Sequence, residues 1–175
     1  MSQLSAISLS IALLGGLATW GFLALGGVFI WAAFVAWGCF FHTGGDEAAL
    51  RNTIIGNAFG VFLAWGAALV ILALPVAATL GLPLWAGLVV GVSVWILCAA
   101  ARIKAFSVIP ASVYGYASTF AFLLQTPEKL SIAKLLALSL DNALLVIPLS
   151  MGIGAVLGYV SAKLGGMLTA AGKPA

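Results

Sequence analysis

The sequence predicts an all-α integral membrane protein, a polytopic bundle of about six transmembrane helices. Of its 175 residues, 64% are hydrophobic and only 6% are charged, whereas roughly a quarter are charged in a soluble domain. Seven Lys/Arg and four Asp/Glu could not cover the surface of a water-soluble chain of this length. The 21 glycines and six tryptophans suit helix packing and the headgroup region of a bilayer. We expect one membrane domain over residues 1–175.

The first three apolar runs predict three helices. A transmembrane helix needs about 20 apolar residues, and residues 4–25 meet this length. The second run, residues 28–41, has only 14 residues before His42 and a polar stretch. The third covers residues 53–74 and stops at Pro75, which cannot continue a helix without breaking its hydrogen bonds.

Three further runs complete the bundle. Residues 84–101 end before a basic pair, and residues 107–124 carry Pro110 near their start. The last run, residues 132–160, is long enough for one continuous helix. The N-terminus lacks the positive stretch of a secretory signal, so we expect the first helix to be retained.

The basic residues predict the orientation, because Lys and Arg favour the cytoplasmic side. With six crossings and a cytoplasmic N-terminus, that side receives Arg51, Arg102, Lys104, Lys163 and Lys173. The other side receives Lys129 and Lys134. This excess predicts that both termini are cytoplasmic.

A faint internal repeat relates two halves, residues 1–75 and 82–165. Residues 56–61 pair with residues 141–146 at an offset of 85, with three identities in six. Three helices per half would make this an inverted-topology repeat, a design that places solute pathways at the repeat interface. Chance similarity in so apolar a chain is the alternative, and the first and fourth segments do not align.

Asp141 is the first candidate site residue, because the sixth predicted helix would carry it at mid-membrane. An acid there costs on the order of 2.5–3.5 kcal/mol on insertion scales and needs a partner, a proton or water. Lys134 lies seven residues earlier, on the same helical face. Asp141 is therefore either half of a structural pair or a pathway or proton-linked group.

Asn57 and Asn142 are amides at matching positions of the repeat. A buried amide must be hydrogen-bonded, either across helices or to a passing solute. Glycines spaced for close helix packing flank Asn57, and the same GxxxG spacing recurs twice more. These glycine pairs are Gly56/Gly60, Gly87/Gly91 and Gly154/Gly158.

His42, Tyr116 and Thr119 complete the pathway-lining candidates. His42, the only histidine, stands near two carboxylates and is either a pH-sensitive group or a solvated interfacial residue. Tyr116 and Thr119 follow Pro110 and either satisfy the carbonyl it frees or line a pore. No catalytic motif, metal-ligand cluster or cofactor signature is present, so we expect no enzyme and no cofactor. Two cysteines in apolar runs, Cys39 and Cys98, fit small core-filling thiols.

Several of these features together resemble a known family. They are the aromatic run 31–41 followed by Gly44-Gly45, the stretch Gly56-Asn57…Gly60, and Ile109-Pro110…Gly115. The chain resembles, over about residues 10–165, the small bacterial inner-membrane proteins catalogued as domain of unknown function 1097. The resemblance implies an inner-membrane location and supplies no activity.

These observations favour a channel or transporter for a small polar or weakly charged solute, passive or proton-linked, in a homo-oligomer. The expected partners are the lipid bilayer and the solute, and not nucleic acid. The alternative is a non-transporting scaffold or small subunit of a membrane complex. Convergence of Asp141, Asn57 and Asn142 on one water-accessible cavity would favour transport, whereas dry helix contacts would favour the scaffold.

Overall fold

The computed structural model describes residues 2–171, and this part of the chain consists of helices and their connections, without strands. Lys173, one of the residues used to predict orientation, lies outside it. Four helices are long and apolar enough to cross a membrane. They are α1 (Gln3–Leu25), α3 (Glu47–Ala73), α5 (Leu82–Ala99) and α8 (Ala143–Ala171). The predicted all-α membrane bundle is confirmed.

Two shorter helices, α2 (Ile30–His42) and α6 (Ile109–Gln125), occupy the centre of the bundle. At 1.5 Å per residue they measure about 20 and about 25 Å, less than the ~30 Å hydrocarbon core. They run antiparallel: the rings of Phe29 and Phe122 are 5.5 Å apart at one end, and His42 meets Tyr114 at the other. Short helices α4 (Ala77–Leu80), η1 (Ala100–Arg102), η2 (Lys104–Phe106) and α7 (Ile132–Leu135) lie in the connections.

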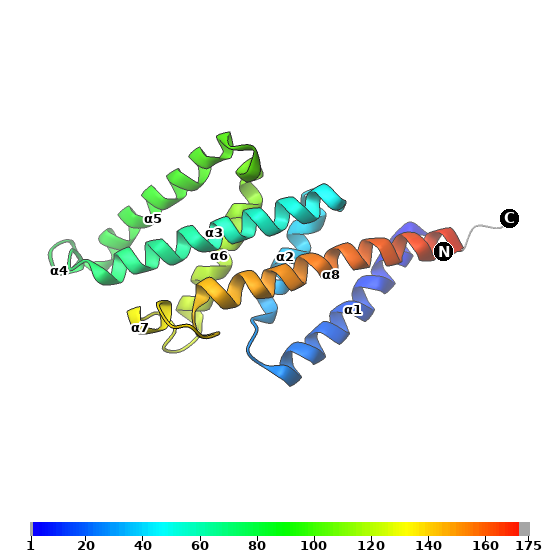
Figure 1. The fold of residues 1–175 in the computed structure, drawn as a ribbon, viewed down its shortest axis with the longest axis horizontal. Helices are drawn as coiled ribbons and strands as arrows, with labels where there is room; N and C mark the ends of the chain where they lie inside the picture. The colour runs from blue at the N-terminus through cyan, green and yellow to red at the C-terminus, as the bar shows by residue number, and fades with distance from the viewer. Residues whose placement is uncertain (1, 172–175) are drawn as a thin grey trace.

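The two halves of the chain are interleaved. Helices α1 and α2 pack against α8, while α5 and α6 pack against α3. The long helices α3 and α8 contact each other, with α1 and α5 on opposite flanks (Figure 1). The first two helices of each half therefore pack mainly on the third helix of the other half.

Glycines allow the backbones of these helices to touch. A Cβ at Gly60 of α3 would lie 1.8 Å from the Ser112 carbonyl oxygen of α6. A Cβ at Gly154 of α8 would lie 1.9 Å from the Ala33 oxygen of α2. Two of the three predicted glycine pairs thus mediate close packing. The third is different, because Gly87 and Gly91 of α5 are exposed and have no neighbour within 4 Å in the described chain.

The predicted sixth helix, residues 132–160, is interrupted, and the prediction of one continuous helix was wrong. Helix α7 ends at Leu135, a turn follows, and α8 starts at Ala143. The Asn142 side chain causes the break: its Oδ1 accepts from the Leu144 amide at 2.9 Å, and its Nδ2 donates to the Ala137 carbonyl at 3.0 Å. Asn side chains compete for local backbone groups in this way and favour helix starts.

The third helix also starts earlier than predicted, at Glu47 instead of residue 53. Asp46 caps it, since its Oδ1 accepts from the Ala49 amide at 2.7 Å. A cap and an acid in the first turn both stabilise a helix N-terminus, so the polar residues excluded from the apolar run are helical.

The core lies between α2, α3, α6 and α8 and is built largely from small and branched side chains. Its members include Ala36, Val61, Phe122, Ile147 and Met151. Helices α1 and α5 are peripheral, because only 17% and 11% of the residues in their most apolar stretches are buried. Most buried polar side chains of the described residues lie on the central four helices or at their ends, with Ser10 of α1 and Ser93 of α5 as the exceptions.

Candidate functional site

The six sequence-predicted residues lie at three levels of the bundle. Asp141 and Asn142 are at one end, His42 is at the opposite end, and the other three are in helices between them. Among the five hollows described for residues 2–171, one contains Asp141, and none contains any of the other five residues. Convergence on one cavity, the arrangement that would favour transport over a scaffold, is therefore not seen in this conformation.

A hollow of about 570 Å³ opens at the first of these levels. It is enclosed by the α1–α2 turn, the last turn of α6 and the segment before α8, and we call it the mouth. Its lining includes Phe29, Phe122, Thr126, Lys129, Ser139 and Asp141. The contact between the Phe29 and Phe122 rings places aromatic side chains where the central helices α2 and α6 meet this hollow.

Asp141 lies in the turn at the rim of the mouth, not inside a helix, and this corrects its predicted mid-membrane position. Its carboxylate pairs with Lys129 and, at 2.6 Å, with Lys134. Hydrogen bonds from these two ammonium groups hold the pKa of Asp141 at about 2, below its ordinary value of 3.8. The hydrogen bond between Lys134 and Asp141 also raises the pKa of Lys134. Asp141 is thus a fixed negative charge near neutral pH.

The pairing with Lys134 was foreseen as the structural alternative, but Lys129 was not. Lys129 comes from the preceding connection, and its ammonium lies 5.9 Å from the Phe122 ring centroid. Asn142 caps the start of α8, and both of its side-chain hydrogen bonds go to backbone groups within five residues of it. The two repeat-matched amides therefore have different surroundings.

Asn57 lies inside the bundle, about 15 Å along α3 from Glu47 at 1.5 Å per residue. It is 1% exposed, and its amide nitrogen and oxygen have no hydrogen-bond partner within the described chain. Ser112 of α6, also 1% exposed, has an unpaired hydroxyl in the same sense. A buried polar group left unpaired costs about 1–3 kcal/mol. Native interiors rarely contain such groups without a reason.

Asn57 and Ser112 belong to one helix contact. Gly56 and Gly60, on either side of Asn57, approach the Ser112 backbone, and a Cβ at Gly115 would lie 2.0 Å from the Asn57 carbonyl. We call Asn57 and Ser112 the interior polar pair. Sequence reasoning missed Ser112, although its position one turn before Gly115 on the same helix face was a usable signal.

Thr119 and Tyr116 are accounted for by bonds within the protein. Thr119 is fully buried, and its hydroxyl donates to the Gly115 carbonyl at 2.9 Å. The Tyr116 hydroxyl lies 2.7 Å from the Ser93 hydroxyl of α5. Tyr116 therefore faces the peripheral helix and ties α6 to it.

At the far end, His42 is exposed and its Nδ1 lies 2.9 Å from the Tyr114 hydroxyl. Neighbouring hydroxyls continue inward: Thr43 is 3.2 Å from Thr53, and Thr53 donates to the Cys39 sulfur at 3.6 Å. Thr53 stands one turn before Asn57 on α3, so polar groups extend from the His42 end toward the interior polar pair.

The carboxylates near His42 in sequence serve other roles. Asp46 caps α3, and Glu47 accepts a hydrogen bond from Tyr159 at 3.1 Å. Within residues 2–171, no cluster of three or more His, Cys, Asp or Glu side chains could hold a metal ion.

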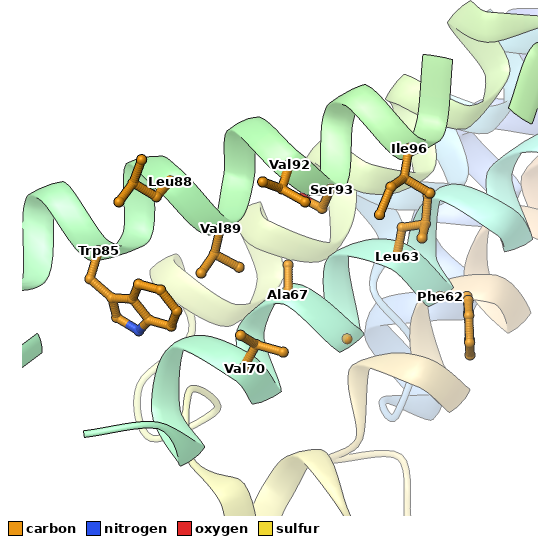
Figure 2. A pocket seen from close by; sticks show the side chains of 11 residues that line it. Phe62, Leu63, Ala67, Val70, Trp85, Leu88, Val89, Val92, Ser93 and Ile96 are labelled. Carbon is orange, nitrogen blue, oxygen red and sulfur yellow. The ribbon is translucent and has the colours of Figure 1, made fainter. Parts of the chain in front are cut away.

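A second large hollow, about 420 Å³, lies between α3 and α5 (Figure 2). Apolar side chains from both helices line it, including Phe62, Val70, Trp85 and Val92, and Ser93 is the one polar residue of this lining. Such a groove suits an apolar chain. It supplies no set of groups that could select a polar solute.

Comparison with known proteins assigns the chain to a family. A family model described as "Protein of unknown function (DUF1097)" matches residues 8–166, and the chain belongs to this family. The resemblance seen in the sequence over about residues 10–165 is thereby confirmed. No curated protein and no solved structure matches the chain.

Proposed function

We propose, for this member of the DUF1097 family, that it lets a small polar solute cross the membrane between α2, α3, α6 and α8. One observation carries the proposal: Asn57 and Ser112 keep three unpaired polar atoms buried in the bundle. A scaffold gains nothing from such groups, because apolar residues of similar shape would pack there at no cost or with a gain in stability. A solute or water that hydrogen-bonds them in transit gives them a role.

The packing supports the inverted repeat that the sequence suggested. In this interpretation α1, α2 and α3 correspond to α5, α6 and α8, and each contact among these six helices has a counterpart under the exchange of halves. In Figure 1, α3 and α8 run in opposite directions, as a two-fold axis near the viewing direction requires. Transporters built from inverted repeats bind solutes at the repeat interface. Here that interface contains the short helices α2 and α6.

The structure corresponds, in this proposal, to a closed conformation. The Phe29–Phe122 contact blocks the path inward from the mouth. The His42–Tyr114 hydrogen bond joins the same two helices at the opposite end. Passage requires α2 and α6 to separate at one end or both. Asp141 remains ionised near neutral pH, which favours the passive form of the original expectation over a proton-linked one.

The orientation is part of the proposal. Lys163 lies 3.8 Å from Glu47 at the start of α3, so basic residues of α3 and α8 share one end of the bundle. Lys129 and Lys134 lie at the mouth, at the other end. The positive-inside rule then places the termini in the cytoplasm and the mouth outside a bacterial inner membrane.

The direct test is stopped-flow light scattering on proteoliposomes challenged with a panel of small solutes. A double-cysteine variant, Phe29→Cys with Phe122→Cys, is made in a background in which Cys39 and Cys98 are Ala. Bridging the two thiols with a bifunctional reagent should stop solute movement, and cleaving the bridge should restore it. The unbridged variant is the matched control. Wild-type rates equal to those of empty liposomes for every solute, with folded protein, would refute passage.

A scaffold role is the second candidate, and the exposed face of α5 favours it. Gly87 and Gly91 are uncovered there, although their spacing suits close helix association. The same face could serve the expected homo-oligomer. Replacing both glycines with Leu should abolish an oligomer measured by mass photometry in detergent and leave solute movement intact. If the replacement abolishes a complex and the wild-type protein moves no solute, the scaffold role is favoured.

A further inference from the structure

We infer that the interior polar pair selects uncharged solutes of a few heavy atoms that carry both a hydrogen-bond donor and an acceptor, with small amides as the model class. The inference rests on the proposed function and concerns which molecules can cross. It depends on the charge of the surrounding helices, on the chemistry of Asn57 and Ser112, and on the close packing of α3 against α6.

The four helices around the proposed path, α2, α3, α6 and α8, carry no charged side chain in their middle parts. Acidic and basic residues are absent from residues 30–41 of α2, 52–73 of α3, 109–125 of α6 and 143–162 of α8. An ion between them would lose its hydration without meeting a counter-charge. Such transfer is far more costly than that of a neutral polar group. The charges of the described chain near this path, including Lys129 and Asp141, are at its ends.

The unpaired groups define what a neutral solute must present. The Asn57 amide has two N–H donors and one carbonyl acceptor, and the Ser112 hydroxyl can donate and accept. A solute with only acceptors would leave the Asn57 oxygen unpaired, and one with only donors would leave its N–H groups unpaired. Sites built from buried hydrogen-bonding groups discriminate strongly against molecules that leave them unpaired. An amide or urea group has both kinds of atom side by side.

Close helix packing limits the size of the solute. A Cβ at Gly56 would lie 2.5 Å from the Ala111 Cβ, and one at Gly60 would lie 1.8 Å from the Ser112 oxygen. None of the hollows described for residues 2–171 includes Asn57 or Ser112. Any opening that forms beside Asn57 during passage is bounded by backbone, which cannot turn away as a flexible side chain can. A solute that reaches Asn57 therefore has few heavy atoms.

The test compares two pairs of probes that have nearly the same shape and differ in charge: urea with guanidinium, and formamide with formate. Proteoliposomes containing the wild-type protein should pass the neutral member of each pair at least about tenfold faster, since a free-energy difference of ordinary hydrogen-bond size already gives that factor. Asn57→Leu should abolish the urea rate, because it replaces the amide with an apolar group of similar size. Ile54→Leu, on the same helix and 40% exposed, is the matched control and should keep the wild-type rate.

The outcomes separate the two proposals. If no probe crosses, the proposed function fails and this inference fails with it. If probes cross but guanidinium keeps pace with urea, or Asn57→Leu keeps the urea rate, only the selectivity inference is overturned. The thermal midpoint of Asn57→Leu should equal or exceed that of wild type, since an unpaired polar group is removed. Should that variant not fold, Ser112→Ala, a smaller change, gives the same comparison, with an expected loss of about tenfold in urea rate.

Discussion

Gly154 sits where α8 crosses α2 with the two backbones in contact, so adding one methyl group there tests the packing directly. In Gly154→Ala the new Cβ would lie 1.9 Å from the Ala33 oxygen, 2.5 Å from its carbonyl carbon and 2.6 Å from its Cα. All three atoms belong to the backbone. The helices must move apart to relieve the overlap.

The size of the effect follows from these distances. A carbon–oxygen contact normally measures about 3.3 Å or more, so the axes must separate by about 1.4 Å at the crossing. Overpacking of this kind costs about 1–3 kcal/mol, and sometimes more. Alanine returns about 0.5–1 kcal/mol because it is the better helix former. Together these terms give a net destabilisation between about 0 and 2.5 kcal/mol, with a central value of about 1 kcal/mol.

Gly152 provides the matched control on the same helix, because a Cβ there would meet nothing within 4 Å in the described chain. Gly152→Ala should keep only the gain of about 0.5–1 kcal/mol. Unfolding in mixed micelles of increasing SDS fraction, followed by far-UV circular dichroism, measures both variants. Their midpoints should shift in opposite directions. Coincident midpoints, or a more stable Gly154→Ala, would refute the close crossing of α2 and α8.

Three further predictions concern hydrogen bonds and ion pairs. Because the pKa of Asp141 is lowered to about 2 from 3.8, its contribution to stability is complete above the ordinary value and is lost as pH falls through about 2. Thermal midpoints should therefore show no Asp141-dependent change from about pH 5 to about pH 8, measured as the difference between wild type and Asp141→Asn; a difference that varies over this range would contradict the assignment. Trp65→Phe removes the 2.8 Å bond from the Trp65 indole to the Leu135 carbonyl, and should cost about 1 kcal/mol and speed hydrogen exchange in α7, with unchanged exchange counting against it. Ser161→Ala leaves the Trp37 indole N–H without its 3.0 Å acceptor and should cost about 0.6–2 kcal/mol in the SDS assay; a wild-type midpoint would show that the bond contributes little.

The interrupted sixth segment shows the limit of apolar periodicity. Residues 132–160 are as apolar as a membrane helix, yet Asn142 bonds to local backbone and ends the turn that separates α7 from α8. The charged groups that pair at this turn also come from separate segments. Lys129 reaches Asp141 because the connection after α6 folds back past the Phe122 ring. Sequence spacing could relate Asp141 to Lys134 but not to Lys129.

Glycine spacing gives a similar contrast. The three GxxxG pairs look alike in the sequence, but two lie in backbone contacts and Gly87/Gly91 faces outward. Spacing places two glycines on one helix face, and it does not say what that face meets. For the same reason the sequence identified Asn57 as buried but could not determine whether it has a hydrogen-bond partner.

The sequence by itself determined that this protein is a membrane bundle of apolar helices, because composition and run length depend only on the solvent the chain must match. It also located α1 and α5 to within a few residues, whereas α3 starts at Glu47 instead of residue 53 and α8 covers Ala143–Ala171 instead of residues 132–160. Only the tertiary structure decided which helices touch, which carboxylate is paired with two lysines, and that Asn57 and Ser112 are left unpaired at one crossing. These properties depend on distances between residues far apart in the chain, and the packing of α3 on α6 and of α8 on α2 sets those distances.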